Sequence, residues 1–158
     1  MKKEIELQKG RVSYVFRVRR VWRRVSLKGS KKDYLKYREQ ALALAQNRIE
    51  HFNKVYGLKY NKISIKNQKT RWGSCSKKGN LNFNYKIVLI SERLADYIIV
   101  HELCHLKEFN HSQKFWNLVG QEIPDYLEIR KELKKGVSRL NAFFRQLAEE
   151  RLTGSKKS

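Results

Sequence analysis

The sequence is poor in the features that mark membrane and secreted proteins. None of its apolar runs approaches the roughly 18 consecutive residues that a membrane span needs. The first residues, Met1 to Glu6, do not form the apolar stretch of a signal peptide. The two cysteines, Cys75 and Cys104, are too few for a disulfide framework in a chain of 158 residues. We therefore expect a soluble, cytoplasmic protein that keeps both thiols reduced and does not act at a membrane.

Acidic residues are also scarce. The chain has 36 Lys and Arg against 15 Asp and Glu, which gives a formal net charge of +21. Such an excess attracts polyanions, chiefly nucleic acid, because binding releases condensed counterions. Residues 92–132 have five basic and eight acidic side chains, so the positive charge lies elsewhere in the chain. We expect the basic N-terminal half to bind DNA or another polyanion, and a surface that only keeps the protein soluble is the simpler alternative.

Length and apolar content predict one α+β domain. A chain of 158 residues with 41% apolar residues can form one compact core, and neither repeats nor a low-complexity linker divides it. Residues 12–27 alternate with a period of two, which is typical of a β-hairpin. We expect this basic hairpin to occupy residues 1–30, the main domain residues 31–152, and a loose tail residues 153–158.

The pattern after residue 30 predicts a long helix followed by a small sheet. Asp33 is placed to cap a helix whose apolar stripe continues until Gly57. Residues 63–65 and 81–89 alternate between apolar and polar side chains, as in half-buried strands. Because residues 78–80 have turn chemistry, we expect an antiparallel sheet against which the helix packs.

Further helices are predicted in the second half of the chain. Ser91 and Ser112 are placed to cap two of them, and Pro124 suits the first turn of a third. The helix that begins after Ser91 carries residues 101–105. A last apolar pattern at helical spacing covers residues 137–147.

Histidine is rare, yet three of its four copies fall within eleven positions. Residues 101–105 read H-E-x-x-H, and residues four apart lie on one face of a helix, so His101 and His105 can share a zinc ion. A catalytic zinc needs a third protein ligand and an open position for water. His111 is the candidate third ligand, and Asn110 is the candidate turn residue that brings it back. The spacing predicts one catalytic zinc ion.

Glu102 is the candidate general base. It follows the first ligand, so it lies beside the metal, where zinc lowers the pKa of water toward about 7 and Glu102 can pass the released proton to the leaving amine. One further side chain can assist the oxyanion, with Tyr85, Arg71 and Tyr126 as candidates. These roles describe a zinc metallopeptidase that hydrolyses peptide bonds in proteins or peptides.

Two other functions fit the same residues. A nucleic-acid-binding module with a structural zinc would need a fourth protein ligand, such as Cys75 or Glu108. A zinc hydrolase that acts on another amide would have a deep closed pocket in place of an open groove. We expect Cys75 to be a buried thiol, Glu108 to lie at the surface or to support a ligand, and Cys104 to pack in the core.

Several segments resemble one known family. They are Arg71-Trp72-Gly73-Ser74-Cys75-Ser76, Gly79-Asn80-Leu81, Asn84, Tyr97-Ile98-Ile99-Val100-His101-Glu102-Leu103-Cys104-His105-Leu106, Asn110-His111-Ser112 and Phe115-Trp116. Over about residues 33–135 the chain resembles the YgjP-like metallopeptidases. It is more distantly similar to the SprT/Spartan and WLM proteases, which digest proteins crosslinked to DNA.

The resemblance implies a zincin-like fold, in which one helix packs on a small sheet, the motif helix lies beneath it and zinc lies at the junction. It implies that His101, His105 and His111 are the metal ligands and that Glu102 is the catalytic glutamate. The distant relatives suggest that DNA-associated proteins are the substrates. We expect an extended substrate to pair with the strand at residues 81–89, as in β-augmentation.

Overall fold

The computed structural model describes residues 29–133 and 135. The predicted N-terminal hairpin, the helix at residues 137–147 and the tail at residues 153–158 lie outside the described residues. None of the helices in the described part is both long and apolar enough to cross a lipid bilayer.

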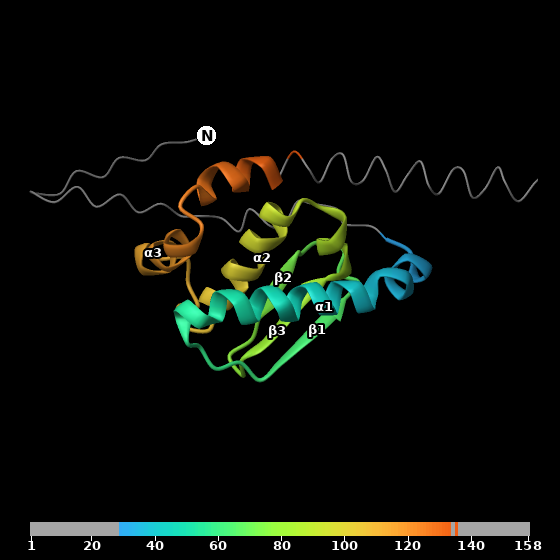
Figure 1. Ribbon diagram of the computed structural model, residues 1–158, viewed down its shortest axis with the longest axis horizontal. Helices are drawn as coiled ribbons and strands as arrows, with labels where there is room; N and C mark the ends of the chain where they lie inside the picture. The colour runs from blue at the N-terminus through green and yellow to red at the C-terminus, as the bar shows by residue number, and fades with distance from the viewer. Residues whose placement is uncertain (1–28, 134, 136–158) are drawn as a thin grey trace, which may run out of the picture.

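The described residues form an α+β fold with a three-stranded sheet and helices packed on it (Figure 1). This confirms the predicted fold class. The elements, in chain order, are α1 (Lys31–Tyr56), β1 (Lys62–Lys66), β2 (Gly73–Cys75), β3 (Asn80–Asn84), the 3-10 helix η2 (Tyr85–Leu89), α2 (Glu92–Cys104) and α3 (Gln113–Glu122), followed by a helix at residues 126–133.

The sheet has the strand order β1-β3-β2 and is mixed. β1 runs parallel to β3, with Ile63 opposite Leu81, whereas β2 runs antiparallel to β3, with Cys75 opposite Leu81. The prediction of a purely antiparallel sheet was therefore wrong. The turn that contains Gly79, at φ 73°, joins β3 to β2. After β1 the chain passes the position of β3 and forms β2, which runs back toward the end of the sheet where β1 began. β3 then starts at that end and can run parallel to β1, because a parallel pair needs such a crossover connection.

The predicted strand at residues 81–89 is also shorter than expected, because β3 ends at Asn84. The side-chain oxygen of Asn84 accepts a hydrogen bond from the Lys86 backbone N–H at 3.2 Å, which caps η2. The side-chain amide of Asn84 donates to the carbonyls of Gln68 and Arg71 at 2.7 and 3.1 Å. The buried positions after Asn84 are thus supplied by a tight helix and not by an extended strand.

Helix α1 is capped by Ser30 and not by Asp33 as predicted. The Ser30 hydroxyl accepts from the Asp33 backbone N–H at 3.0 Å and donates to its carboxylate at 2.6 Å, so Asp33 reinforces the cap from the first turn. The helix ends before Gly57, at φ 58°, which confirms the predicted end. Arg48 ties α1 to α2 through two hydrogen bonds to the carboxylate of Asp96, at 2.6 and 2.7 Å.

One face of the sheet is apolar and the other is polar. Leu81 and Phe83 of β3 are fully buried, whereas the Asn82 amide between them donates to the Ser74 hydroxyl at 3.3 Å. Helix α1 packs on β1 and η2, and α2 packs on β2 and contacts α1. Such alternation of buried apolar and polar side chains along a strand is typical of a sheet that is covered by helices on one face only. β2 is an edge strand that lies beside the motif helix.

The two helices of the second half begin where the sequence predicted. Ser91 and Ser112 are the N-cap residues of α2 and α3, and the Ser112 hydroxyl accepts from the Phe115 backbone N–H at 3.5 Å. Cys104, the last residue of α2, is fully buried in the core, as expected. Cys75 and Cys104 are both free thiols.

Candidate metal centre

Helix α2 and the loop after it bring the three histidines together. His101 lies in the last turn of α2 and His105 is its C-cap, so the two residues stand about one turn apart. The chain then turns at residues 105–107 and bends at residues 109–110, which include the predicted turn residue Asn110. This loop returns His111 to the helix end, immediately before α3.

The three imidazoles are spaced as ligands of one metal ion. One ligand atom from each ring lies within 4.8 Å of the other two. The Nε2 atoms of His101 and His111 are 3.0 Å apart, and the ring centres of His105 lie 4.8 Å from those of the other two. A tetrahedral zinc ion with Zn–N bonds of about 2.0–2.1 Å places its nitrogen ligands about 3.3 Å apart. The 3.0 Å separation is close to this value and no pair exceeds 4.8 Å, so the three donors are grouped as ligands of one ion are.

The loop holds the His105 ring in the orientation that a metal requires. His105 Nδ1 lies 2.9 Å from the backbone oxygen of Glu108, and a carbonyl only accepts, so Nδ1 carries the proton and Nε2 is left for a metal. The buried Phe115 ring stacks on His105 at 4.5 Å. Glu108 supports the site through its main chain. Among the described residues, neither its carboxylate nor Cys75 joins the histidine group.

An aromatic stack supports His111 from the other side. Trp116 stacks on His111 with ring centres 5.5 Å apart, and Tyr126 lies nearly parallel to Trp116 at 5.0 Å. The Arg130 guanidinium lies 4.6 Å from the centre of the Trp116 ring, in a cation–π contact. The sequence alone did not predict these contacts. The Phe115-Trp116 pair just after His111 was a local signal, whereas Arg130 had none.

The electrostatic environment keeps the histidines neutral. Burial is the largest cause of a lowered pKa at all three, and the pKa of His111 falls to about 4. At His101 and His111 the neighbouring imidazoles lower the pKa further. Neutral imidazole is the form that binds a metal, so the chemistry of these donors fits such an ion.

Glu102 lies buried beside the histidines and against the edge strand. Burial raises its pKa to about 8, and the positive charge of Arg71 opposes that rise. A Cβ atom on Gly73 of β2 would lie 2.6 Å from the Glu102 Cγ and 2.8 Å from its Oε1. Only glycine leaves room for this carboxylate. No local pattern in the sequence predicts this role of Gly73, which lies within one of the segments that resemble the YgjP-like family.

The three oxyanion candidates occupy different places. Arg71, just before β2, is close enough to affect the pKa of Glu102. Tyr126 belongs to the aromatic stack beside the histidines. Tyr85 is fully buried in η2 and stacks on Tyr37 of α1 at 6.4 Å, within the contact between α1 and the sheet. The structure therefore brings Arg71 and Tyr126, but not Tyr85, to the neighbourhood of the histidines.

Comparison with known families agrees with this geometry. The YgjP-like metallopeptidase domain matches residues 24–136. The chain belongs to the YgjP-like family. This YgjP-like protein is therefore a metal-dependent peptidase, and its substrates are proteins or peptides, as the sequence predicted. No match is found among curated proteins.

Two solved structures are similar to this YgjP-like chain. The metallopeptidase zymogen abylysin of Pyrococcus abyssi is 25% identical with a TM-score of 0.55, and the match covers 60% of this chain and 95% of abylysin. The metallopeptidase zymogen jannalysin of Methanocaldococcus jannaschii is 27% identical with a TM-score of 0.53, with coverages of 59% and 96%. Both similarities support the α+β metallopeptidase fold.

Proposed function

We propose that this protein is a zinc-dependent peptidase in which His101, His105 and His111 hold one zinc ion and Glu102 is the general base. The observation that carries the proposal is the convergence of three neutral imidazoles, with ligand atoms within 4.8 Å, beside a buried carboxylate. Three protein ligands leave one position of a tetrahedral zinc site for water, which distinguishes catalytic sites from structural ones. This favours a peptidase over a binding module with a structural zinc.

Zinc at such a site supplies Lewis acidity, which activates water and polarises a carbonyl group. Glu102 accepts a proton from the attacking water and delivers it to the nitrogen of the leaving amine. Burial favours the neutral, protonated form of Glu102, which delivers the proton, while the positive charge of Arg71 favours the ionised form, which accepts it. Arg71 is the best-placed of the three oxyanion candidates because it lies next to both Glu102 and the edge strand β2.

The substrate chain pairs with the outer edge of β2. The sequence assigned this role to the strand at residues 81–89, but β3 is the central strand and is paired on both sides. β2 has a free edge among the described strands, and its Gly73 lies directly against Glu102. A substrate that adds to this edge brings its backbone carbonyl groups past the carboxylate and the histidines, as in other cases of β-augmentation.

Glu102→Gln separates catalysis from metal binding. Wild type and Glu102→Gln are each expected to hold one equivalent of zinc, and the variant is expected to cleave a casein-like substrate at least about 100-fold more slowly, because proton transfer is lost. Glu108→Gln is the matched control, since Glu108 supports His105 only through its backbone oxygen. Metal content by mass spectrometry and cleavage rate are measured on the same samples.

Two outcomes would contradict the proposal. If Glu102→Gln cleaves as fast as wild type, Glu102 is not the base. If zinc is bound and wild type cleaves no protein or peptide, the metal is structural or the enzyme acts on another amide, which a panel of small amide substrates then tests.

We further infer that the basic part of the chain directs proteolysis to DNA-associated proteins. The support is the formal charge of +21, which lies outside the slightly acidic segment 92–132 that carries the histidines. Single-stranded DNA is expected to stimulate casein cleavage at low salt and to lose this effect as the salt concentration rises. Cleavage that is unaffected by DNA at every salt concentration would contradict this inference.

A further inference from the structure

One face of the sheet points away from the helices that pack on it. Side chains alternate along each strand, so residues that lie opposite one another in the register share a face. Gly73 of β2 and Phe83 of β3 are such a pair, and they face the helices, because Gly73 lies against Glu102 and Phe83 is fully buried. The next pair, Ser74 and Asn82, therefore faces away from α2. The strand residues on this polar face are Lys62, Ser64 and Lys66 of β1, Ser74 of β2, and Asn80 and Asn82 of β3.

The polar face belongs to a part of the chain that has no acidic residue. Residues 57–90, which contain all three strands and η2, include eight Lys and Arg and no Asp or Glu. Lys86 is buried in η2, and the other seven are exposed, including Lys62 and Lys66. Within the part of the chain that the structure describes, none of these seven takes part in a salt bridge. The sheet is thus a basic layer, whereas the acidic residues of the described part lie on the helices and in the segments that follow α2.

The side chains on this face are of the kinds that contact nucleic-acid phosphates. Such contacts come from Lys and Arg and from the polar side chains of Ser and Asn. Lys62 and Lys66 lie on the same face of β1, about 13 Å apart at about 3.3 Å per residue. Ser64, Asn82 and Ser74 form a row of hydroxyl and amide groups across the three strands, from a position between the two lysines. Cations separated by hydrogen-bonding groups fit a backbone that has a phosphate at every nucleotide.

Resting on the proposed recruitment to DNA, we infer that the polar face of the sheet binds the sugar–phosphate backbone of nucleic acid and that Lys62 and Lys66 contact phosphates. None of the six strand residues on this face is aromatic, so they provide no ring on which a base can stack. Binding through them is therefore independent of base sequence. A membrane surface is a poorer partner, because the same six residues include no apolar side chain to insert among lipids.

Nucleic acid on this face leaves the metal site free. Gly73 and Ser74 are neighbours in β2 but face opposite sides of the sheet, Gly73 toward Glu102 and Ser74 toward the polar face. A bound strand therefore lies across the sheet from the motif helix, and the edge of β2 separates the two surfaces. A protein attached to that nucleic acid reaches the edge strand by passing around β2, without competing with the nucleic acid for space.

The test measures binding of a labelled single-stranded oligonucleotide of mixed sequence to the zinc-loaded full chain, by fluorescence anisotropy at a series of salt concentrations. Lys62→Gln/Lys66→Gln is expected to raise Kd at least about tenfold at low salt and to reduce the slope of log K against log salt by about 1.4, since each lost phosphate contact removes about 0.7 for a single strand. Lys32→Gln/Lys36→Gln is the matched control, because it removes the same charge from exposed residues of α1, the helix that packs on the other face. This control is expected to raise Kd less than about threefold. Tm and zinc content are measured for both variants to verify the fold.

Several results would overturn the inference. An unchanged Kd in Lys62→Gln/Lys66→Gln, or an equal rise in both variants, would show that the affinity comes from another part of the chain or from net charge alone. A preference of more than about tenfold for one base sequence would show readout of bases and not of the backbone. Displacement of the oligonucleotide by poly-glutamate at equal charge concentration would show that the face binds any polyanion.

The binding assay needs no cleavage, so its result is independent of the proposed peptidase activity. If Lys62→Gln/Lys66→Gln weakens binding as expected but the oligonucleotide does not stimulate casein cleavage by wild type, the recruitment proposed above fails and the binding surface stands. If DNA stimulates cleavage equally in wild type and in Lys62→Gln/Lys66→Gln, recruitment stands and its assignment to the polar face is wrong.

Discussion

At the scale of single residues, the position of Glu102 depends on the missing side chain of Gly73. The carboxylate occupies the space that a Cβ atom on this strand residue would need. The Glu102 carboxylate, our proposed general base, is therefore positioned by contact between α2 and β2, as well as by its place next to His101 in the motif. A substitution in β2 can therefore displace Glu102 without changing any of the three histidines.

Gly73→Ala is expected to retain zinc and to reduce kcat/KM by about 10- to 100-fold, because a shift of about 1 Å in the base costs about that much. Gly120→Ala is the matched control, since its added Cβ would meet Tyr126 only at 3.8 Å, an ordinary contact. Steady-state cleavage and metal content are measured for both. Wild-type activity in Gly73→Ala would show that Glu102 tolerates displacement.

Some residues of the proposed site could be predicted from the sequence and others could not. His101, His105 and Glu102 follow from a local spacing on one helix, and His111 from its nearness in the chain. Gly73 and Arg130 reach the site from β2 and from the helix at residues 126–133, and no local pattern encodes such contacts. Their roles appear only when the packing is known.

At the scale of elements, Asn84 joins the end of β3 to the loop that leads into β2. Its amide binds the carbonyls of Gln68 and Arg71, and its backbone N–H donates to the Trp72 carbonyl at 2.7 Å. Asn84 is fully buried. The loop that carries Arg71 toward Glu102 is therefore positioned from the central strand.

Asn84→Ala is expected to lower the free energy of unfolding by about 3 kcal/mol, because several buried polar groups lose their partners at about 1–3 kcal/mol each. Asn82→Ala, on the polar face of the same strand, is expected to cost under about 1 kcal/mol, since its bonds to Ser74 are long, at 3.3 and 3.5 Å. Urea unfolding of both variants gives the comparison. An equal loss of unfolding free energy in the two variants would show that the hydrogen bonds of Asn84 stabilise the fold no more than those of Asn82.

The same residue explains why the sheet was only partly predictable. Alternation from Leu81 to Leu89 reads as one strand, but the side-chain hydrogen bonds of Asn84 end the strand and start η2. β2, with three residues and no apolar alternation, gave no strand signal. Since this short strand inserts between β1 and β3 in the chain, the parallel pairing could not be read from local patterns. The starts of α2 and α3 and the end of α1 were predictable because capping is local, whereas the predicted cap of α1 was displaced from Asp33 to Ser30.

At the scale of the whole molecule, the proposed metal site links α2 to α3 through residues 105–112, so metal should stabilise the fold. A ligand present at about 100 times its Kd adds about 2.7 kcal/mol to the free energy of unfolding. For a chain of this size that corresponds to a rise in Tm of about 5 °C or more. Removal of zinc with a chelator is expected to lower Tm by this amount, as measured by calorimetry.

Two histidine variants make this prediction specific. His111→Ala is expected to lose most of the zinc-dependent shift in Tm. His51→Ala, at an exposed position of α1, is expected to keep it. An equal shift in both variants would indicate that zinc stabilises the protein from another site.

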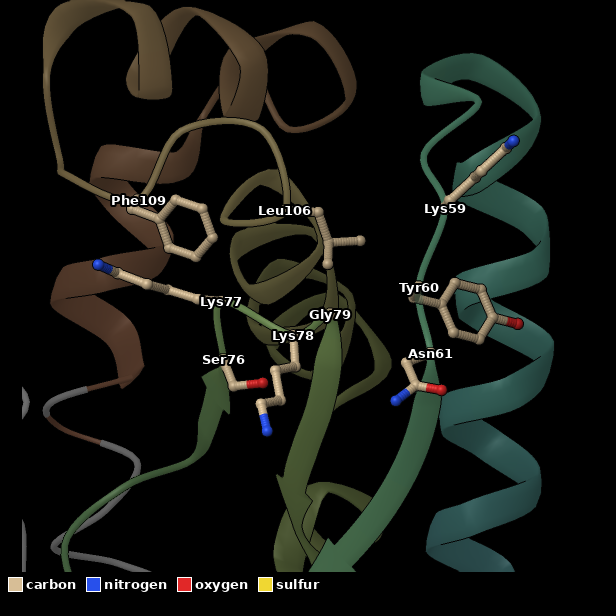
Figure 2. A pocket seen from close by; sticks show the side chains of 9 residues that line it. All are labelled: Lys59, Tyr60, Asn61, Ser76, Lys77, Lys78, Gly79, Leu106 and Phe109. Carbon is tan, nitrogen blue, oxygen red and sulfur yellow. The ribbon is translucent and has the colours of Figure 1, made fainter.

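Leu106 and Phe109, in the segment that connects His105 to His111, line a pocket of about 330 Å³ at the end of the sheet (Figure 2). A ligand that orders this segment changes the free energy of both binding events, and thermodynamic reciprocity makes the effect equal in both directions. A ligand that tightens zinc binding by a given factor must itself bind more tightly to the zinc form by the same factor. The protein would then lose its metal most slowly while that ligand is bound.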